Sequence, residues 1–158
     1  MKPYLNIIAT ISVVAATSMG CQEAEENRFE HACDHVGDSP LSVIADAVAS
    51  VDAPDISQAH TNYEVSFTEV DGGLGGAVTF GADESGDYAL VLSADVPLTL
   101  SDASGDALTL EETMTSPCDQ GGVGYVYLLS LGTTQIEFGP TSDTSVELVV
   151  EHLEDHDH

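Results

Sequence analysis

The side chains best able to do chemistry in this sequence are its six histidines, because three of them lie in the last seven residues. Imidazole and carboxylate groups together bind Zn(II), Cu(II) or Ni(II). His156 and His158 share a face of an extended chain, while His152 and His156 share one in a helical turn. We therefore predict a transition-metal site in the tail, with a solvated acidic tail as the alternative. Its ligands would be His152, His156, His158 and Asp155.

A second histidine cluster lies near the N-terminus, where His31 and His35 flank Cys33. Their spacing of four places both rings on one face of a helix or of a strand. The two could form a further metal site with His60, provided that the fold brings the start of the strand expected at residue 62 close to them. The alternative is a pair of surface histidines beside a disulfide.

Calcium is the second choice of metal. Oxygen ligands are frequent in the turns at residues 83–87 and 102–106. Neither turn has the spacing of a known calcium loop, and Asp and Gly are frequent in ordinary hairpin turns for backbone reasons. We therefore rank calcium below the transition metals.

No catalytic motif is present in the sequence. Gly-x-Ser-x-Gly, a phosphate-cradling loop and His-Glu-x-x-His are all missing. The glycine-rich stretch 72–76 lacks the lysine and the following helix of a phosphate site, so it is expected to form a hairpin tip or bulge. We predict that the protein is not an enzyme and has no catalytic residue.

The elements that must position the histidines follow an N-terminal export signal. Lys2 supplies a positive start, and the apolar run 5–16 is too short to span a membrane, so residues 1–20 are predicted to be a signal peptide. The sequence Ser18-Met19-Gly20-Cys21 resembles the lipobox of bacterial lipoproteins, although Ser18 stands where leucine is usual. The resemblance implies a lipid on Cys21 and a membrane anchor; ordinary secretion after Ser18 or Gly20 is the alternative.

The cysteine count agrees with lipidation. Three cysteines are an odd number for an exported protein, and a lipid on Cys21 leaves Cys33 and Cys118 as a pair. A disulfide between them would close a loop of about 85 residues and restrain the unfolded chain by about 4–5 kcal/mol. Buried or metal-binding thiols are the alternative.

The net charge excludes some partners. With 28 acidic and two basic residues the chain carries a formal charge of -26, which repels nucleic acid and anionic lipid headgroups and attracts cations. The polar, acidic stretch 21–32 is predicted to be a tether between the membrane and a folded domain.

From residue 33 to 151 the chain alternates short apolar runs with Gly, Asp, Ser and Pro, which is typical of a single all-β domain. We predict a β-sandwich, jelly-roll-like or Ig-like, of about eight or nine antiparallel strands. The first predicted strand, at residues 41–51, is compatible with a helix as well. The predicted strands are 41–51, 62–70, 76–80, 88–93, 96–101, 107–112, 123–131, 134–138 and 145–151.

The layout of three of these segments is similar to that of secreted pre-peptidase C-terminal domains. It consists of a Gly-x-Tyr strand at 86–92, a strand ending in a turn at 102–106, and a further strand at 125–128 followed by Gly132, where the usual aromatic residue is missing. The resemblance implies a non-catalytic accessory module with a β-sandwich fold.

These observations favour an exported, lipid-anchored protein of the cell envelope, on its periplasmic or outer face, that captures or hands off a transition metal. A secreted form is the alternative location. The alternative function is a non-catalytic interaction or structural module that binds an envelope protein or a glycan.

Overall fold

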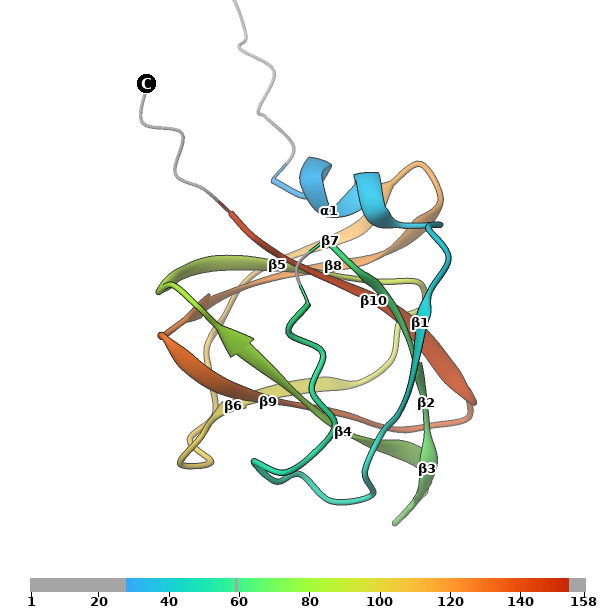
Figure 1. Ribbon diagram of the computed structural model, residues 1–158. Helices are drawn as coiled ribbons and strands as arrows, with labels where there is room; N and C mark the ends of the chain where they lie inside the picture. The colour runs from blue at the N-terminus through green and yellow to red at the C-terminus, as the bar shows by residue number, and fades with distance from the viewer. Residues whose placement is uncertain (1–27, 59, 154–158) are drawn as a thin grey trace, which may run out of the picture.

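The computed structural model of the protein describes residues 28–58 and 60–153. They form two β-sheets packed face to face, with a short helix on the outer face of one sheet (Figure 1). The prediction of an all-β sandwich is therefore confirmed. No helix in this part of the chain has the length and hydropathy to cross a membrane.

The larger sheet has six strands and the smaller one four. The larger contains, from edge to edge, β1 (Leu41–Ile44), β2 (Asn62–Ser66), β10 (Ser145–His152), β5 (Gly86–Leu92), β8 (Gly121–Leu129) and β7 (Leu110–Cys118). The smaller contains β3 (Thr68–Val70), β4 (Gly73–Ala82), β9 (Gly132–Thr141) and β6 (Leu98–Asp102).

The strand count and one orientation differ from the prediction. The run 62–70, expected to be one strand, passes from the larger sheet to the smaller at Phe67, whose ring lies 5.5 Å from that of Phe138 in the core. The described chain therefore has ten strands. The first of them, β1, pairs parallel to β2, and it covers only the first four residues of the predicted segment 41–51.

The glycine-rich stretch forms the hairpin tip and the bulge that the sequence predicts. Asp71 and Gly72 connect β3 to β4, with Gly72 at a φ of 91°. The register then shifts between Leu74 and Gly76, where the backbone lies so close to Ala45 that a Cβ on Gly76 would be 2.7 Å from the Ala45 Cβ. Glycine is required there by both its φ and this close approach.

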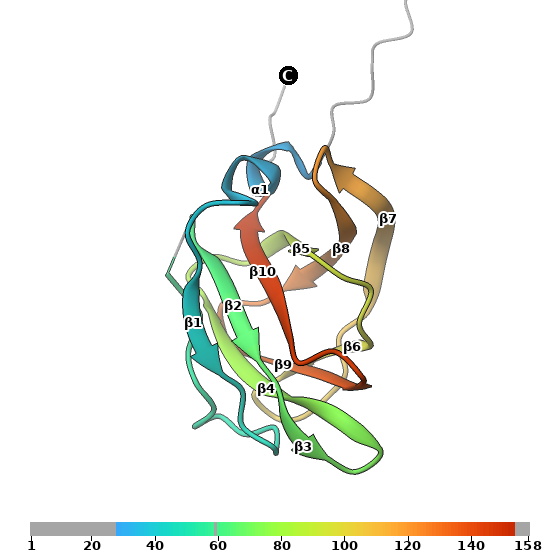
Figure 2. The same cartoon turned by 90° about the vertical axis from the view of Figure 1, so that its right-hand side faces the viewer.

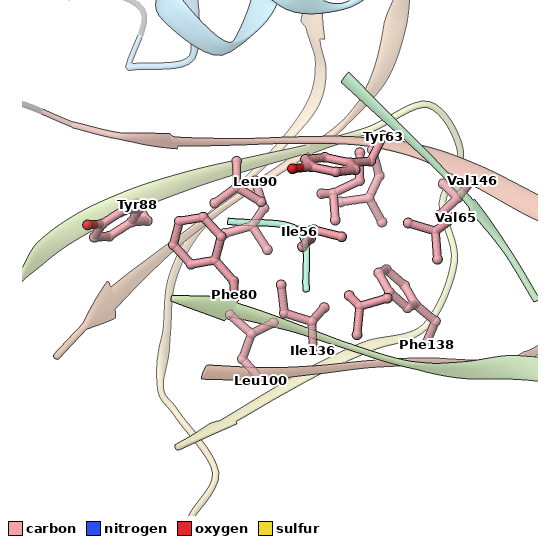
Figure 3. Close-up of a cluster of buried hydrophobic side chains, with 14 of the residues drawn as sticks. Ile56, Tyr63, Val65, Phe80, Tyr88, Leu90, Leu100, Ile136, Phe138 and Val146 are labelled. Atoms are coloured by element: carbon pink, nitrogen blue, oxygen red, sulfur yellow. The ribbon is translucent and has the colours of Figure 1, made fainter. Parts of the chain in front are cut away.

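The main core lies between the two sheets (Figure 3). Strand alternation directs one face of each strand inward, and each buried aliphatic or aromatic side chain contributes about 1.5–3 kcal/mol. Ile56 belongs to no strand but comes from the 45–57 segment and fills the space between the layers. The labelled strand residues around it are Tyr63, Val65, Phe80, Tyr88, Leu90, Leu100, Ile136, Phe138 and Val146.

A second, smaller core lies beneath helix α1 (Glu30–His35), on the outer face of the larger sheet. Phe29 and Ala32 are fully buried there, so the folded domain begins earlier than residue 33, within the segment predicted as a tether. Gly124 of β8 leaves room for the Phe29 ring, since a Cβ would lie 2.5 Å from it.

Two further contacts fix α1 on the sheet. Cys33 and Cys118 form the predicted disulfide. Arg28 pairs with Asp87 of β5 and, at 3.1 Å, with Glu112 of β7. Burial lowers the pKa of Arg28, but its hydrogen bonds to these carboxylates outweigh that effect and raise the pKa overall. A six-residue helix is marginal in isolation, so its position depends on these contacts.

Candidate metal centre

Three elements that are distant in sequence meet at one end of the larger sheet. They are helix α1, the segment entering β2, and the end of β10 (Figure 2). They bring together His35, His60 and Glu151, whose donor atoms all lie within 4.8 Å of one another. Among the described residues, these three side chains are arranged so that they could hold one metal ion.

Glu151 forms the floor of this site. Along β10, Val150 faces the main core, so Glu151 shares the outer face with Val149, which packs beneath α1. The helix leaves the glutamate only 6% exposed. Its Oε1 atom accepts no hydrogen bond within the described structure. A buried carboxylate oxygen without a donor is rare and calls for an explanation, of which a bound ion is one.

His60 reaches the glutamate from the neighbouring strand. Asn62 pairs with Val149, so the same register places residue 60 opposite Glu151. His60 has a φ of 54°, in the left-handed region. Its Nδ1 atom lies 3.2 Å from Oε1 of Glu151, without hydrogen-bond geometry. Strained backbone of this kind clusters at binding sites.

His35 approaches from the last turn of α1. Its Nε2 atom lies 3.8 Å from Oε1 of Glu151, and its Nδ1 atom lies 3.3 Å from the Asp38 carboxylate. Asp38 is itself held by Asn62, whose Nδ2 donates to the Asp38 carbonyl at 3.1 Å. A carboxylate on one imidazole nitrogen, with the other nitrogen directed at the site, is the usual arrangement behind a metal-binding histidine.

These distances fit a transition metal after a small adjustment. Donors around a tetrahedral zinc ion at about 2.0–2.1 Å lie about 3.4 Å from one another. The two distances to Glu151, 3.2 and 3.8 Å, bracket that value. The side chain of His60 is 67% exposed and is therefore free to rotate toward an ion seated on Glu151.

The remaining predicted ligands lie elsewhere. His31 is exposed and is not part of the group, although it stands one helical turn before His35. His152 follows Glu151 but projects from the opposite face of β10, where its ring lies 4.8 Å from that of Tyr88 and its Nδ1 lies 4.0 Å from Glu84. Predicted residues Cys21, Asp155, His156 and His158 lie outside the described residues.

Sequence reasoning missed Glu151 and Asp38. Glu151 was assigned to the last position of a predicted strand, and one glutamate among 28 acidic residues carries no signal of its own. A usable signal was the apolar Val149 on the same face, which indicates that something covers this side of β10. Asp38, three residues after His35, has the spacing of a helical neighbour.

One of the two calcium candidates, the turn 102–106, has a structural explanation. Asp102 Oδ1 accepts hydrogen bonds from the backbone N–H groups of Ser104, at 2.8 Å, and Asp106, at 3.0 Å. This aspartate therefore caps its own turn, as aspartates in tight turns commonly do.

Comparison with known proteins adds no family to this description. No protein-family model matches the chain, and no curated protein matches it. Of the resemblances drawn from the sequence, the structure shows the β-sandwich.

Proposed function

We propose that this protein is an exported, lipid-anchored component of the cell envelope that binds a divalent transition metal at His35, His60 and Glu151 and hands it on. The observation that supports this most strongly is the buried Glu151 oxygen, which has no hydrogen-bond donor among residues 28–58 and 60–153 and lies within reach of two imidazole nitrogens.

The metal-free site carries an energetic cost. A buried polar atom without a partner costs about 1–3 kcal/mol, and more if it is charged. Neutral imidazoles do not cancel the charge of the Glu151 carboxylate. A dication would both pair with the carboxylate and accept the lone pairs of His35 and His60. Metal binding therefore removes a defect that the folded chain otherwise carries.

The donor set favours zinc, copper or nickel. Two imidazoles and one carboxylate suit these borderline ions, whereas calcium and magnesium require mostly oxygen ligands. The Cys33–Cys118 disulfide supports an oxidising compartment, where export would place the chain.

The histidine tail has a role in this proposal as the collector of ions. His156 is five residues from Glu151, a contour length of at most about 17 Å. Asp155, His156 and His158 would raise the local metal concentration and pass ions to the site. The protein binds and transfers the metal and carries out no reaction on it.

The test is a calorimetric zinc titration in about 0.5 M NaCl, which screens weak binding by surface carboxylates. We expect one tight site in the mature protein. Its affinity should fall by at least about tenfold in His35→Ala or His60→Ala. His31→Ala is the matched control, because this histidine lies on the same helix outside the group. Equal affinity in all four proteins would rule out the site.

A chain that ends after Leu153 separates the tail from the site. We expect the tight site to remain and the additional weak zinc binding to disappear. Loss of the tight site on truncation would assign binding to the tail instead.

Mass spectrometry of the mature protein from envelope membranes tests the anchor. A diacylated N-terminal residue at Cys21 is expected. An intact N-terminus, or cleavage without a lipid, would contradict the proposed anchor without affecting the metal site.

A second candidate function is supported by the edge of the larger sheet. Strand β1 has a neighbour on one side only, and it carries the exposed side chains Leu41, at 49%, and Ile44, at 69%. An open edge with apolar residues suits pairing with a strand of an envelope protein. A crosslinker placed at Ser42 would capture that protein, and Ile44→Lys should abolish the capture.

A further inference from the structure

We propose that the metal at this site keeps one outward coordination position, and that this position accepts a neutral nitrogen donor of the imidazole type from a second molecule. The inference rests on the proposed function. It adds the chemistry by which the ion would leave, namely ligand exchange with an incoming imidazole.

The number and direction of the protein ligands leave one position of the ion open toward solvent. Within residues 28–58 and 60–153 the group offers three donors, whereas zinc and its neighbours take at least four. The side chains become more exposed from the floor of the site outward, from 6% for Glu151 through 26% for His35 to 67% for His60. The missing donor therefore has to approach from solvent, past His60.

The charge at the site favours a neutral fourth ligand. Glu151 contributes one negative charge directly, and Asp38 contributes another through its contact with the His35 ring. Together they balance the two positive charges of the ion. An anionic fourth ligand would leave the site net negative, in a chain that already carries a formal charge of -26. A neutral donor adds a bond without that penalty.

The neutral donor that suits these ions is an imidazole nitrogen. Zinc, copper and nickel bind imidazole nitrogen well, and water is the weaker neutral competitor. An imidazole that enters beside His60 gives a site with three nitrogens and one carboxylate. As His60 departs, the ion stays bound by the incoming ring, so transfer never requires a free aqueous ion.

The experiment uses the mature protein and, in parallel, the chain that ends after Leu153, which lacks the tail histidines. Both are loaded with Co(II), whose visible spectrum reports its coordination. Imidazole should change the spectrum with saturation at one equivalent per cobalt, and azide should bind at least about tenfold more weakly. A short blocked peptide with one histidine is the second arm. If it matches imidazole, the donor can be a protein side chain. If imidazole alone binds, the donor is a small molecule.

A separate variant tests how the charge at the site affects the binding of an anion. Asp38→Asn removes one of the two balancing charges, so azide should bind about threefold to tenfold more tightly to the loaded protein. Asp34→Asn is the matched control, since this acidic residue lies on α1 outside the group and should leave azide binding unchanged.

The outcomes separate the two proposals. Failure of Co(II) to bind at all would remove the proposed function. Cobalt that binds but whose spectrum is unchanged by imidazole would show a closed site and overturn this inference alone. Azide binding as tight as imidazole binding would also overturn it.

Discussion

Replacing Glu151 with glutamine should stabilise the metal-free protein while weakening its hold on metal. The substitution keeps the shape of the side chain and removes the charge. In the metal-free site, Glu151 is 6% exposed and its Oε1 atom has no hydrogen-bond donor in the part of the chain that the structure describes. Most core substitutions destabilise a protein, so a gain in stability would be a distinctive result.

The magnitude follows from the burial of this carboxylate. An unpaired buried polar group costs about 1–3 kcal/mol, and part of that cost remains because glutamine retains a carbonyl oxygen. We therefore expect a gain of about 1–2 kcal/mol in the free energy of unfolding. For a domain of this size 1 kcal/mol corresponds to about 4 °C, so the melting temperature should rise by about 4–8 °C.

The assay is thermal unfolding followed by circular dichroism, with EDTA and with zinc, at about pH 8, where ordinary imidazoles are mostly neutral. Zinc at 100 times its Kd should add about 2.7 kcal/mol to the wild-type protein and much less to Glu151→Gln. The order of the two melting temperatures should therefore reverse on adding zinc.

Glu147→Gln is the matched control for this experiment. Glu147 lies on the same face of β10, but its Oε2 atom accepts a hydrogen bond from Asn62 Nδ2 at 3.0 Å. That substitution should leave stability unchanged or lower it. A metal-free Glu151→Gln protein that melts below the wild type at about pH 8 would refute the argument that this carboxylate is uncompensated.

Three other predictions concern the surroundings of the site. Asp38→Asn should lower zinc affinity about tenfold in a titration with unchanged stoichiometry, because the carboxylate orients His35; unchanged affinity would exclude that role. The double substitution of Cys33 and Cys118 by serine should lower the free energy of unfolding by about 4–5 kcal/mol in urea and weaken zinc binding, because α1 carries His35; an unchanged zinc affinity would mean that other contacts suffice to dock α1. Burial raises the pKa of four tyrosines, so the free energy of unfolding should have its full value below about pH 10 and should fall as the pH rises beyond it. Tyrosine absorbance should then titrate together with unfolding. Ionisation of these tyrosines without unfolding would contradict their assignment as buried groups. These tyrosines are Tyr63, Tyr88, Tyr125 and Tyr127.

Local pattern in the sequence was sufficient for the sandwich and for the disulfide. Period-two alternation depends on neighbouring residues alone, so the strands were predictable from short windows. The pairing of Cys33 with Cys118 followed from cysteine parity once Cys21 was set aside. The passage of the chain between sheets at Phe67 was not predictable, since alternation continues unbroken through it.

The metal site depends on contacts between residues far apart in the chain. The spacing of His31 and His35 favoured both equally, but only His35 lies where α1 meets β10. His60 was a ligand on condition that β2 began beside the helix, and its register with β10 meets that condition. The burial of Glu151 exists because α1 packs over the outer face of the sheet. Composition and periodicity determine which residues can bind a metal, whereas tertiary packing decides which of them are brought together and desolvated.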